Sequence, residues 1–135
     1  MTERTLVLVK PDAVRRGLVG EILGRFERKG LQVVAMDLRR IDAETADRHY
    51  AEHVGKAFYA ALREFVTSGP LVAVLLEGDE AIPVVRSLVG ATDGRSAAAG
   101  TIRGDFSLSN RENLVHASDS AEAATREAGI FFPNL

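Results

Sequence analysis

The sequence predicts a single-domain α/β sandwich over residues 1–135, and three observations support this fold class. A chain of 135 residues has the length of one domain. By size scaling it buries about two-thirds of its extended surface, which suffices for a core without disulfides. Four short apolar segments alternate with amphipathic segments, an order typical of helices packed on a sheet. Cysteine is absent, so thiolate catalysis and thiolate metal sites are excluded.

The chain is predicted to begin with a strand, a helix and a second strand. Residues 5–9 are β-branched and apolar, which is typical of a buried strand, and the turn Lys10-Pro11-Asp12 ends it. Residues 18–26 place four apolar side chains on one helical face, and Gly30 can end that helix. Residues 31–40 form the second expected strand.

Two helices and a third strand are expected next. Asp42 is a good N-cap for a helix that runs to about Glu52. Apolar residues between 58 and 66 recur at helical spacing, and Ser68-Gly69-Pro70 stops that helix. Residues 71–77 form the third expected strand.

The last third of the chain is predicted to hold two more helices around a fourth strand. Asp79 is expected to cap a helix that ends near Val89. The glycine-rich segment 90–111 lacks periodicity and is expected to be a functional loop. Residues 113–116 form the fourth strand, and Asp119 with Glu122 resembles the capping box of a final helix. This order leaves open both a split βαβ arrangement and a parallel sheet.

Charge and hydropathy limit the expected partners and location. The net charge of −2 argues against a broad basic surface, so no specific nucleic-acid partner is expected. The longest apolar run, residues 71–76, is far shorter than a membrane span, and the first residues lack the apolar stretch of a signal peptide. We therefore expect a cytoplasmic protein without membrane contact. Fourteen of the 17 basic residues are arginine, through composition bias or because some of them bind phosphate.

Short motifs need weighing against simpler interpretations. Glycine-rich phosphate loops are absent from the sequence, so a nucleotide site would have to use side chains. His49-Tyr50-Ala51-Glu52-His53 fits the H-x-x-E-H pattern of zinc peptidases, but a third ligand is not evident and a solvated or packed pair is favoured. Arg103-Gly104-Asp105 spells a cell-adhesion tripeptide, which is disfavoured without an export signal.

His116 is the main catalytic candidate. It follows the fourth predicted strand and precedes a helix start, a junction where α/β proteins place reactive groups and where helix amides attract anions. Glu127 lies eleven residues later, at a position from which it can fold back to orient the imidazole. A structural role is the commoner one for a lone histidine, so the residues alone leave both interpretations open.

Five motifs run in order along nearly the whole chain. They are Lys10-Pro11-Asp12-Ala13-Val14, Arg16-Gly17-Leu18-Val19-Gly20-Glu21-Ile22, Ser68-Gly69-Pro70, Gly100-Thr101-Ile102-Arg103-Gly104-Asp105-Phe106 and Asn113-Leu114-Val115-His116-Ala117-Ser118-Asp119-Ser120. Together they resemble the nucleoside diphosphate kinase family. The resemblance implies an α+β ferredoxin-like βαββαβ sandwich with a four-stranded antiparallel sheet. It implies Mg²⁺-dependent, ping-pong transfer of the γ-phosphate of a nucleoside triphosphate, usually ATP, to a nucleoside diphosphate. It also implies broad base specificity and a homo-oligomer, either the hexamer of most members or the tetramer of some bacterial ones.

The resemblance assigns catalytic roles to five residues. His116 is the phosphorylated nucleophile, attacking through Nδ1, and a neutral imidazole suits this role near neutral pH because its ordinary pKa is about 6.5. Glu127 holds the ring, and Ser118 lies beside the leaving or attacking oxygen. Lys10 and Tyr50 lie near the transferred group.

Nucleotide-binding residues are implied as well. The phosphate ligands are Arg86, Thr92 and Arg103. Lys10 and Asn113 hold the ribose hydroxyls, while Phe58 stacks on the base with Leu62 nearby, and stacking alone tolerates every base. Mg²⁺ is held mainly by the nucleotide phosphates, with Asp119 as a ligand through water. From the residues alone, Phe58 and Leu62 fit a core stripe equally well.

The chain departs from the family pattern at four positions. Ala117 replaces the glycine that usually follows the catalytic histidine, at a cost of about 1 kcal/mol if that position needs φ > 0. Gly94 and Ala99 replace prolines in the loop before Arg103, and Ala57 replaces one before Phe58. Each lost proline costs about 0.4–1 kcal/mol where the geometry suits proline, and that loop forms subunit contacts in hexameric members.

Two rival functions remain open at this point. Ala117 and the altered loop would suit a nucleotide-binding module without turnover, for which ADP would bind but no phosphate would move. His49 and His53 would suit a metallopeptidase, for which zinc would be present and a chelator would abolish activity.

Overall fold

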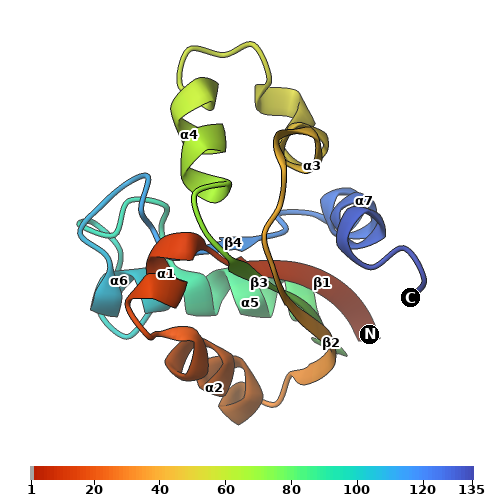
Figure 1. Ribbon diagram of the computed structural model, residues 1–135. Helices are drawn as coiled ribbons and strands as arrows, with labels where there is room; N and C mark the ends of the chain where they lie inside the picture. Colours follow the sequence, from red (N-terminus) through yellow and green to blue (C-terminus); the bar gives the residue numbers. More distant parts are fainter. Residues whose placement is uncertain (1) are drawn as a thin grey trace.

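The computed structural model describes residues 2–135 as an α+β sandwich (Figure 1). Its four strands are β1 (Thr2–Val9), β2 (Gln32–Arg39), β3 (Leu71–Asp79) and β4 (Val115–Ala117). They form one sheet in the order β2-β3-β1-β4, and every neighbouring pair is antiparallel. The ferredoxin-like arrangement is therefore confirmed, and the parallel sheet that the element order also permitted is wrong.

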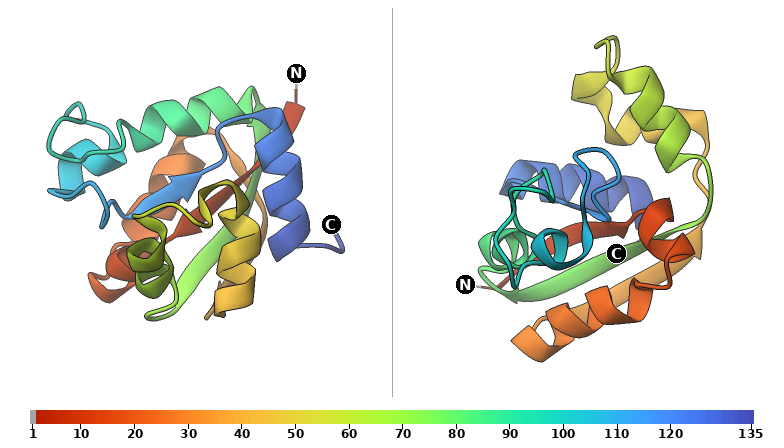
Figure 2. Two further views of the ribbon diagram at one scale, coloured as in Figure 1. Left: turned by 90° about the horizontal axis from the view of Figure 1, so that it is seen from above. Right: turned by 90° about the vertical axis from the view of Figure 1, so that its left-hand side faces the viewer.

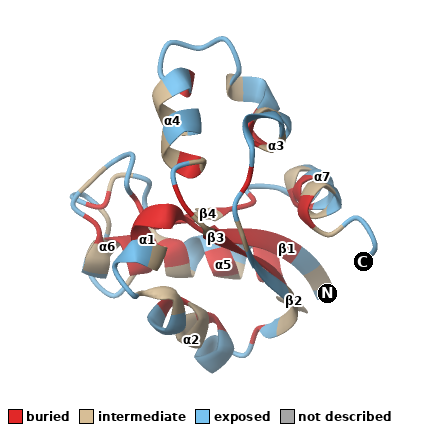
Figure 3. Cartoon of the chain, in the orientation of Figure 1, coloured by how far each residue is buried: buried red, intermediate tan, exposed pale blue. Residues whose placement is uncertain are grey.

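Helices cover both faces of the sheet (Figure 2). The helices of one layer are α2 (Val19–Lys29) and α5 (Ala81–Val89), and those of the other are α3 (Ala43–His49), α4 (Tyr59–Val66) and α7 (Ala121–Phe131). Side chains alternate along β1, so Val7 and Val9 enter the first core while Leu6 and Leu8 enter the second. Because both faces are buried along the second half of β1 (Figure 3), residues 6–9 are apolar at every position.

Three short elements complete the chain: α1 (Pro11–Arg15), the 3₁₀ turn η1 (Ala51–His53) and α6 (Ile102–Phe106). The segment expected to be an irregular loop thus contains a helix, α6, capped by the Thr101 hydroxyl, which accepts from the Gly104 amide at 2.9 Å. Sequence periodicity missed α6 because five residues are too short to show it. A Cβ at Gly104 would lie 1.9 Å from the Ala98 carbonyl oxygen, so the helix packs closely against the loop before it.

The sequence predicts two helix ends correctly and three others wrongly. Asp42 caps α3 by accepting from the Thr45 amide at 2.8 Å, and Gly30, with φ of 109°, ends α2. The helix after Asp42 ends at His49 and gives way to η1, instead of continuing to about Glu52.

The predicted caps of the last two long helices are wrong. Glu80, with φ of 50°, precedes α5 instead of Asp79, and the Ile82 amide donates to the Glu3 carboxylate of β1 at 2.9 Å. Ser120 caps α7 by accepting from the Ala123 amide, which leaves Asp119 outside the helix. Among residues 2–135, no helix has the length and apolar character needed to cross a membrane.

Candidate active site

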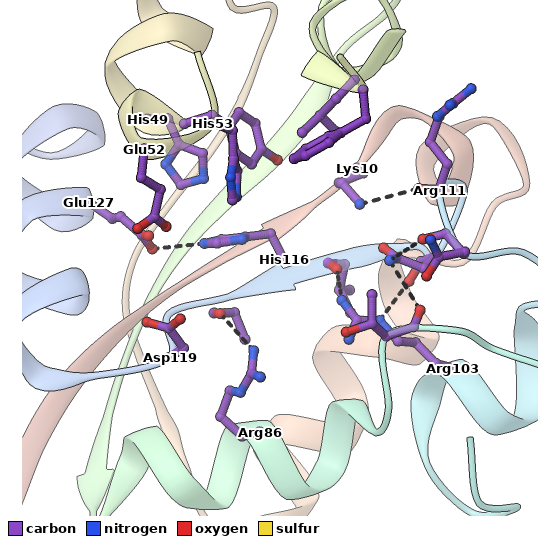
Figure 4. Close-up of a pocket in the computed structure, with 18 residues that line it drawn as sticks. Lys10, His49, Glu52, His53, Arg86, Arg103, Arg111, His116, Asp119 and Glu127 are labelled. Atoms are coloured by element: carbon purple, nitrogen blue, oxygen red, sulfur yellow. Dashed lines mark hydrogen bonds and ion pairs between the residues drawn. The ribbon is translucent and has the colours of Figure 1, made fainter. Parts of the chain in front are cut away.

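A pocket of about 360 Å³ opens beside β4, between the α3–α4 pair and the loops around α6 (Figure 4). Eleven of the twelve residues that the family resemblance places in the site line this pocket. They are Lys10, Tyr50, Phe58, Leu62, Arg86, Thr92, Arg103, Asn113, His116, Asp119 and Glu127. The fold thus brings together side chains from both ends of the chain.

His116 is the central residue of β4 and pairs with Leu8 of β1. Its Nε2 lies 2.8 Å from Oε1 of Glu127, which α7 supplies from eleven residues further along. A carboxylate only accepts hydrogen bonds, so in the neutral imidazole Nε2 carries the hydrogen and Nδ1 keeps the lone pair. This arrangement prepares Nδ1 to act as a nucleophile.

Glu127 is a buried carboxylate that three neighbours hold ionised. Burial raises its pKa, but hydrogen bonds from His116 and Ser118 and the charges of His116 and Arg126 outweigh burial and hold the pKa below its ordinary value. The charge can therefore stabilise a positive imidazole ring in this pocket.

Ser118 is the one implied site residue that the structure places elsewhere. It is fully buried, and its hydroxyl donates to Glu127 Oε1 at 2.7 Å. In this structure it lies behind Glu127 and positions that carboxylate, and its place beside the transferred oxygen stays a prediction.

Two arginines line the pocket, and each donates hydrogen bonds to backbone carbonyls. The buried Arg103 donates to three backbone carbonyls, those of Asn113 at 3.2 Å, Gly90 at 3.1 Å and Val115 at 2.6 Å. Arg86 donates to the carbonyl of Ala117 at 3.2 Å. Burial and then the charge of Arg86 lower the pKa of Arg103 to about 10, which leaves the guanidinium charged at neutral pH.

Lys10 follows β1 directly and is buried. Burial and then the charge of Arg103 lower its pKa to about 8, against an opposing effect of Asp12. The three cations Lys10, Arg86 and Arg103 share one small pocket, and no carboxylate of residues 2–135 forms a salt bridge with any of them, which favours an anionic ligand.

The mouth of the pocket is apolar on one side. Phe58 precedes α4 and its exposed fraction is 48%, so its assignment to a core stripe is wrong. Leu62 is partly buried against the core. His53 lies beside Phe58 with ring centroids 5.3 Å apart, and it extends this side of the pocket. The sequence pointed to His53 only as one of the two histidines in the zinc-peptidase pattern, not as part of a nucleotide pocket.

Asn113 presents an unused acceptor. Its Nδ2 donates to the carbonyls of Asn110 at 2.8 Å and Thr92 at 3.2 Å, while its buried Oδ1 has no hydrogen-bond partner in the part of the chain that the structure describes. The next residue, Leu114, has φ of 75°, and Asp12 accepts from its amide at 3.1 Å. A buried acceptor without a partner marks a place for a donor from a ligand.

The loop substitutions match local geometry. The Gly94 amide donates to the Ser109 carbonyl at 3.2 Å, and a Cβ at this position would lie 2.3 Å from the Ser107 carbonyl oxygen. A proline would lose that hydrogen bond and clash, so glycine suits this backbone.

Ala117 lies in β4 opposite Val7, and it is not among the residues with positive φ in the described chain. The expected backbone cost therefore does not arise. We predict that Ala117→Gly retains activity and lowers stability by about 0.5–1 kcal/mol, because glycine loses more entropy in a strand. Turnover and thermal unfolding measure both effects, and a large loss of activity would contradict the prediction.

The fold and the site first define a class of protein: a ferredoxin-like α+β sandwich whose cationic pocket presents a carboxylate-held histidine to an anionic ligand. Comparison with known proteins then identifies the family. The family model for nucleoside diphosphate kinase matches residues 3–135, and the chain belongs to this family, whose general function is phosphate transfer between nucleotides.

Relatives support this assignment along the whole chain. A nucleoside diphosphate kinase from Nocardioides sp. is 71% identical over 135 residues, which cover all of both chains. One from Staphylothermus marinus is 60% identical over 131 residues, covering 97% of this chain and 93% of that one. The structure of a halophilic nucleoside diphosphate kinase from Halobacterium salinarum in complex with CDP matches with a TM-score of 0.96 and 49% identity, covering 99% of this chain and 90% of that one.

Proposed function

We propose that the chain carries out its phosphate transfer through a phosphohistidine on Nδ1 of His116. The observation that carries this proposal is the 2.8 Å contact between His116 Nε2 and Glu127, because it leaves Nδ1 with the lone pair. Nδ1 attacks the γ-phosphorus of a nucleoside triphosphate, usually ATP, while the bond to the bridging oxygen breaks and the diphosphate leaves. A terminal phosphate oxygen of a second diphosphate then attacks the phosphohistidine and restores His116.

The remaining pocket residues support this route. Arg86 and Arg103, whose guanidinium groups donate to backbone carbonyls, would stabilise the charge that spreads over the equatorial oxygens. Thr92 and Tyr50 would contact the phosphates and the transferred group.

Sugar and base would occupy the other side of the pocket. The unpartnered Oδ1 of Asn113 suits a ribose hydroxyl, which Lys10 would share. The exposed Phe58 ring offers a stacking surface beside Leu62, without selecting a base edge. The CDP complex of the halophilic relative is consistent with a site that accepts pyrimidines as well as purines.

Mg²⁺ bound to the nucleotide phosphates would neutralise part of their charge. Asp119 lies at the pocket edge and is exposed. Its carboxylate is an oxygen ligand of the kind that Mg²⁺ accepts through water. It would therefore contact, through a water, the Mg²⁺ that the nucleotide phosphates bind.

Incubation with γ-labelled ATP and Mg²⁺ tests the proposed route. We expect acid-labile, alkali-stable label on the protein, which a nucleoside diphosphate then removes. ADP binding without label would favour a module that has lost turnover. Loss of activity on zinc removal would instead favour the metallopeptidase.

The pocket also predicts a pH dependence of nucleotide affinity. Only the protonated Lys10 amine attracts phosphate, and its pKa is about 8 in the free protein. Raising the pH through 8 removes this charge, so ADP should bind roughly tenfold more weakly at pH 9 than at pH 7. Calorimetry over this range measures the change, and Lys10→Arg, which stays charged, should flatten it. An unchanged affinity between pH 7 and pH 9 would contradict the prediction.

We also propose a homo-oligomer, a hexamer or, as the alternative, a tetramer. The edge strand β2 exposes Met36 at 56% and Leu38 at 63%, which is an unusual edge for an isolated chain. Leu38→Lys should weaken assembly at this edge, as light scattering will show. A monomeric parent protein, or an unchanged mass in the variant, would contradict this. A single domain over residues 1–135 and a cytoplasmic location stay predictions.

A further inference from the structure

One buried side chain of the pocket has no part in the proposed phosphate transfer. His49 ends α3 and is 1% exposed. Its ring meets Tyr50, His116 and Phe131 edge-on, with centroid distances of 4.5, 4.5 and 5.4 Å. Neither of its ring nitrogens has a hydrogen-bond partner among residues 2–135. A buried imidazole without partners is unusual, and its two nitrogens are available to bind a ligand.

The neighbours of His49 supply the rest of a ligand set. One donor atom each from His49, His116 and Glu127 lies within 4.8 Å of the other two, and Figure 4 shows the three side chains on one wall of the pocket. Two imidazoles and a carboxylate are the protein ligands of zinc sites that keep a fourth position open. Ligand atoms on one zinc lie roughly 3–3.5 Å apart by the usual bond lengths, so small side-chain rotations would close the site.

The charge states also suit a metal. Burial, and then the charges of His116 and Arg126, hold the pKa of His49 well below its ordinary value. The ring is therefore neutral and keeps a lone pair at neutral pH. Hydrogen bonds hold Glu127 ionised. All three residues line the pocket, which provides the path by which an ion enters.

We propose that Zn²⁺ binds to His49, His116 and Glu127 in the nucleotide-free, unphosphorylated protein and inhibits it. On binding, the neutral imidazole of His116 changes tautomer: Nε2 gives its proton to solvent, Nδ1 takes one from solvent, and Nε2 bonds to the metal in place of its hydrogen bond to Glu127. One carboxylate oxygen, one nitrogen of His49 and a water complete four ligands. Mg²⁺ does not substitute, because it prefers oxygen ligands.

The inhibition rests on the proposed function of His116, whereas the binding does not. A metal on Nε2 withdraws electron density from the ring and removes the hydrogen bond to Glu127. Nδ1 then carries the ring hydrogen and has no free lone pair, so it cannot attack the phosphate. Zinc should therefore slow phosphate incorporation even when Mg²⁺ is in large excess.

Zinc titration of the full, nucleotide-free chain tests the binding. We expect one Zn²⁺ per chain, measured by calorimetry. Co²⁺ in place of Zn²⁺ should show the visible bands of a four-coordinate site. His49→Gln should lower zinc affinity by more than about 100-fold, since even outer-shell changes cost 10–100-fold. The matched control His53→Gln, in the other histidine of the same motif, should leave zinc affinity unchanged.

Further measurements distinguish the loss of a zinc ligand from the loss of the fold. Circular dichroism and ADP affinity show whether His49→Gln is folded, and Glu127→Gln should lower zinc affinity independently. The proposed zinc site would be overturned if His49→Gln and Glu127→Gln bound zinc as tightly as the parent protein. It would also be overturned if His53→Gln lost as much zinc affinity as His49→Gln. Binding without slower labelling would overturn the inhibition. Failure of His116 to be labelled without zinc would reject the proposed function instead.

Discussion

His116→Ala is expected to abolish phosphate transfer while ADP still binds. The substitution removes the proposed nucleophile, and such losses reach at least about 10⁴-fold. No neighbour is suited to replace it: burial raises the pKa of the Tyr50 hydroxyl, and among residues 2–135 no carboxylate hydrogen-bonds to His49 to direct a lone pair toward the phosphate. Lys10, Arg86 and Arg103 stay in place, so the affinity for ADP should change little.

Labelling with γ-labelled ATP and ADP calorimetry measure the two halves of this result. Glu127 loses one hydrogen-bond partner in the variant but keeps Ser118 and Arg126, so we expect a folded protein. His53→Ala, at the pocket mouth, serves as the control that alters the pocket without touching Nδ1. Label retained in His116→Ala would reject the proposed nucleophile.

Arg103→Lys should reduce both activity and stability, the second large effect that we expect. Lysine keeps a charge but cannot donate to the carbonyls of Asn113, Gly90 and Val115 together. Buried carbonyls without partners cost about 1–3 kcal/mol each, so the free energy of unfolding should fall by roughly 2–5 kcal/mol. Loss of one fixed donor to the transferred phosphate should lower turnover by roughly 10²–10³-fold.

Arg86→Lys is the matched control, because Arg86 is exposed and has a single backbone carbonyl partner, on Ala117. It should lower turnover but shift the unfolding temperature far less than Arg103→Lys. Denaturant unfolding and steady-state rates on both variants separate the two roles. Equal losses of stability in the two variants would show that the network of carbonyl contacts around Arg103 is not what stabilises the fold.

Features that depend on neighbouring residues were predictable from the sequence. The strands and the long helices follow apolar periodicity, and Gly30 and Asp42 end or begin helices through contacts within one turn. The predicted cap of α5 was wrong because the Ile82 amide donates to Glu3, 79 residues away. Helix α6 was not predicted because its packing against Ala98 leaves no periodic pattern in the sequence.

The candidate site shows the same division. Ordered motifs predicted which residue types share the pocket, yet not that Ser118 lies behind Glu127 or that His49 packs on His116. The latter pair is 67 residues apart, and the H-x-x-E-H pattern pointed to His53 instead.

By itself, the sequence determined most of the segments that form strands and helices, the family resemblance and most of the residues that line the pocket, because residue type and periodicity are local properties. Only the tertiary structure decided the register of the paired strands, the hydrogen bond that leaves Nδ1 of His116 free, and the grouping of His49 with His116 and Glu127. Those features depend on contacts between distant segments, such as Leu6 with Ser118 across 112 residues. The spacing of residues along a chain does not encode such contacts, which arise when β1, β4 and α7 pack together.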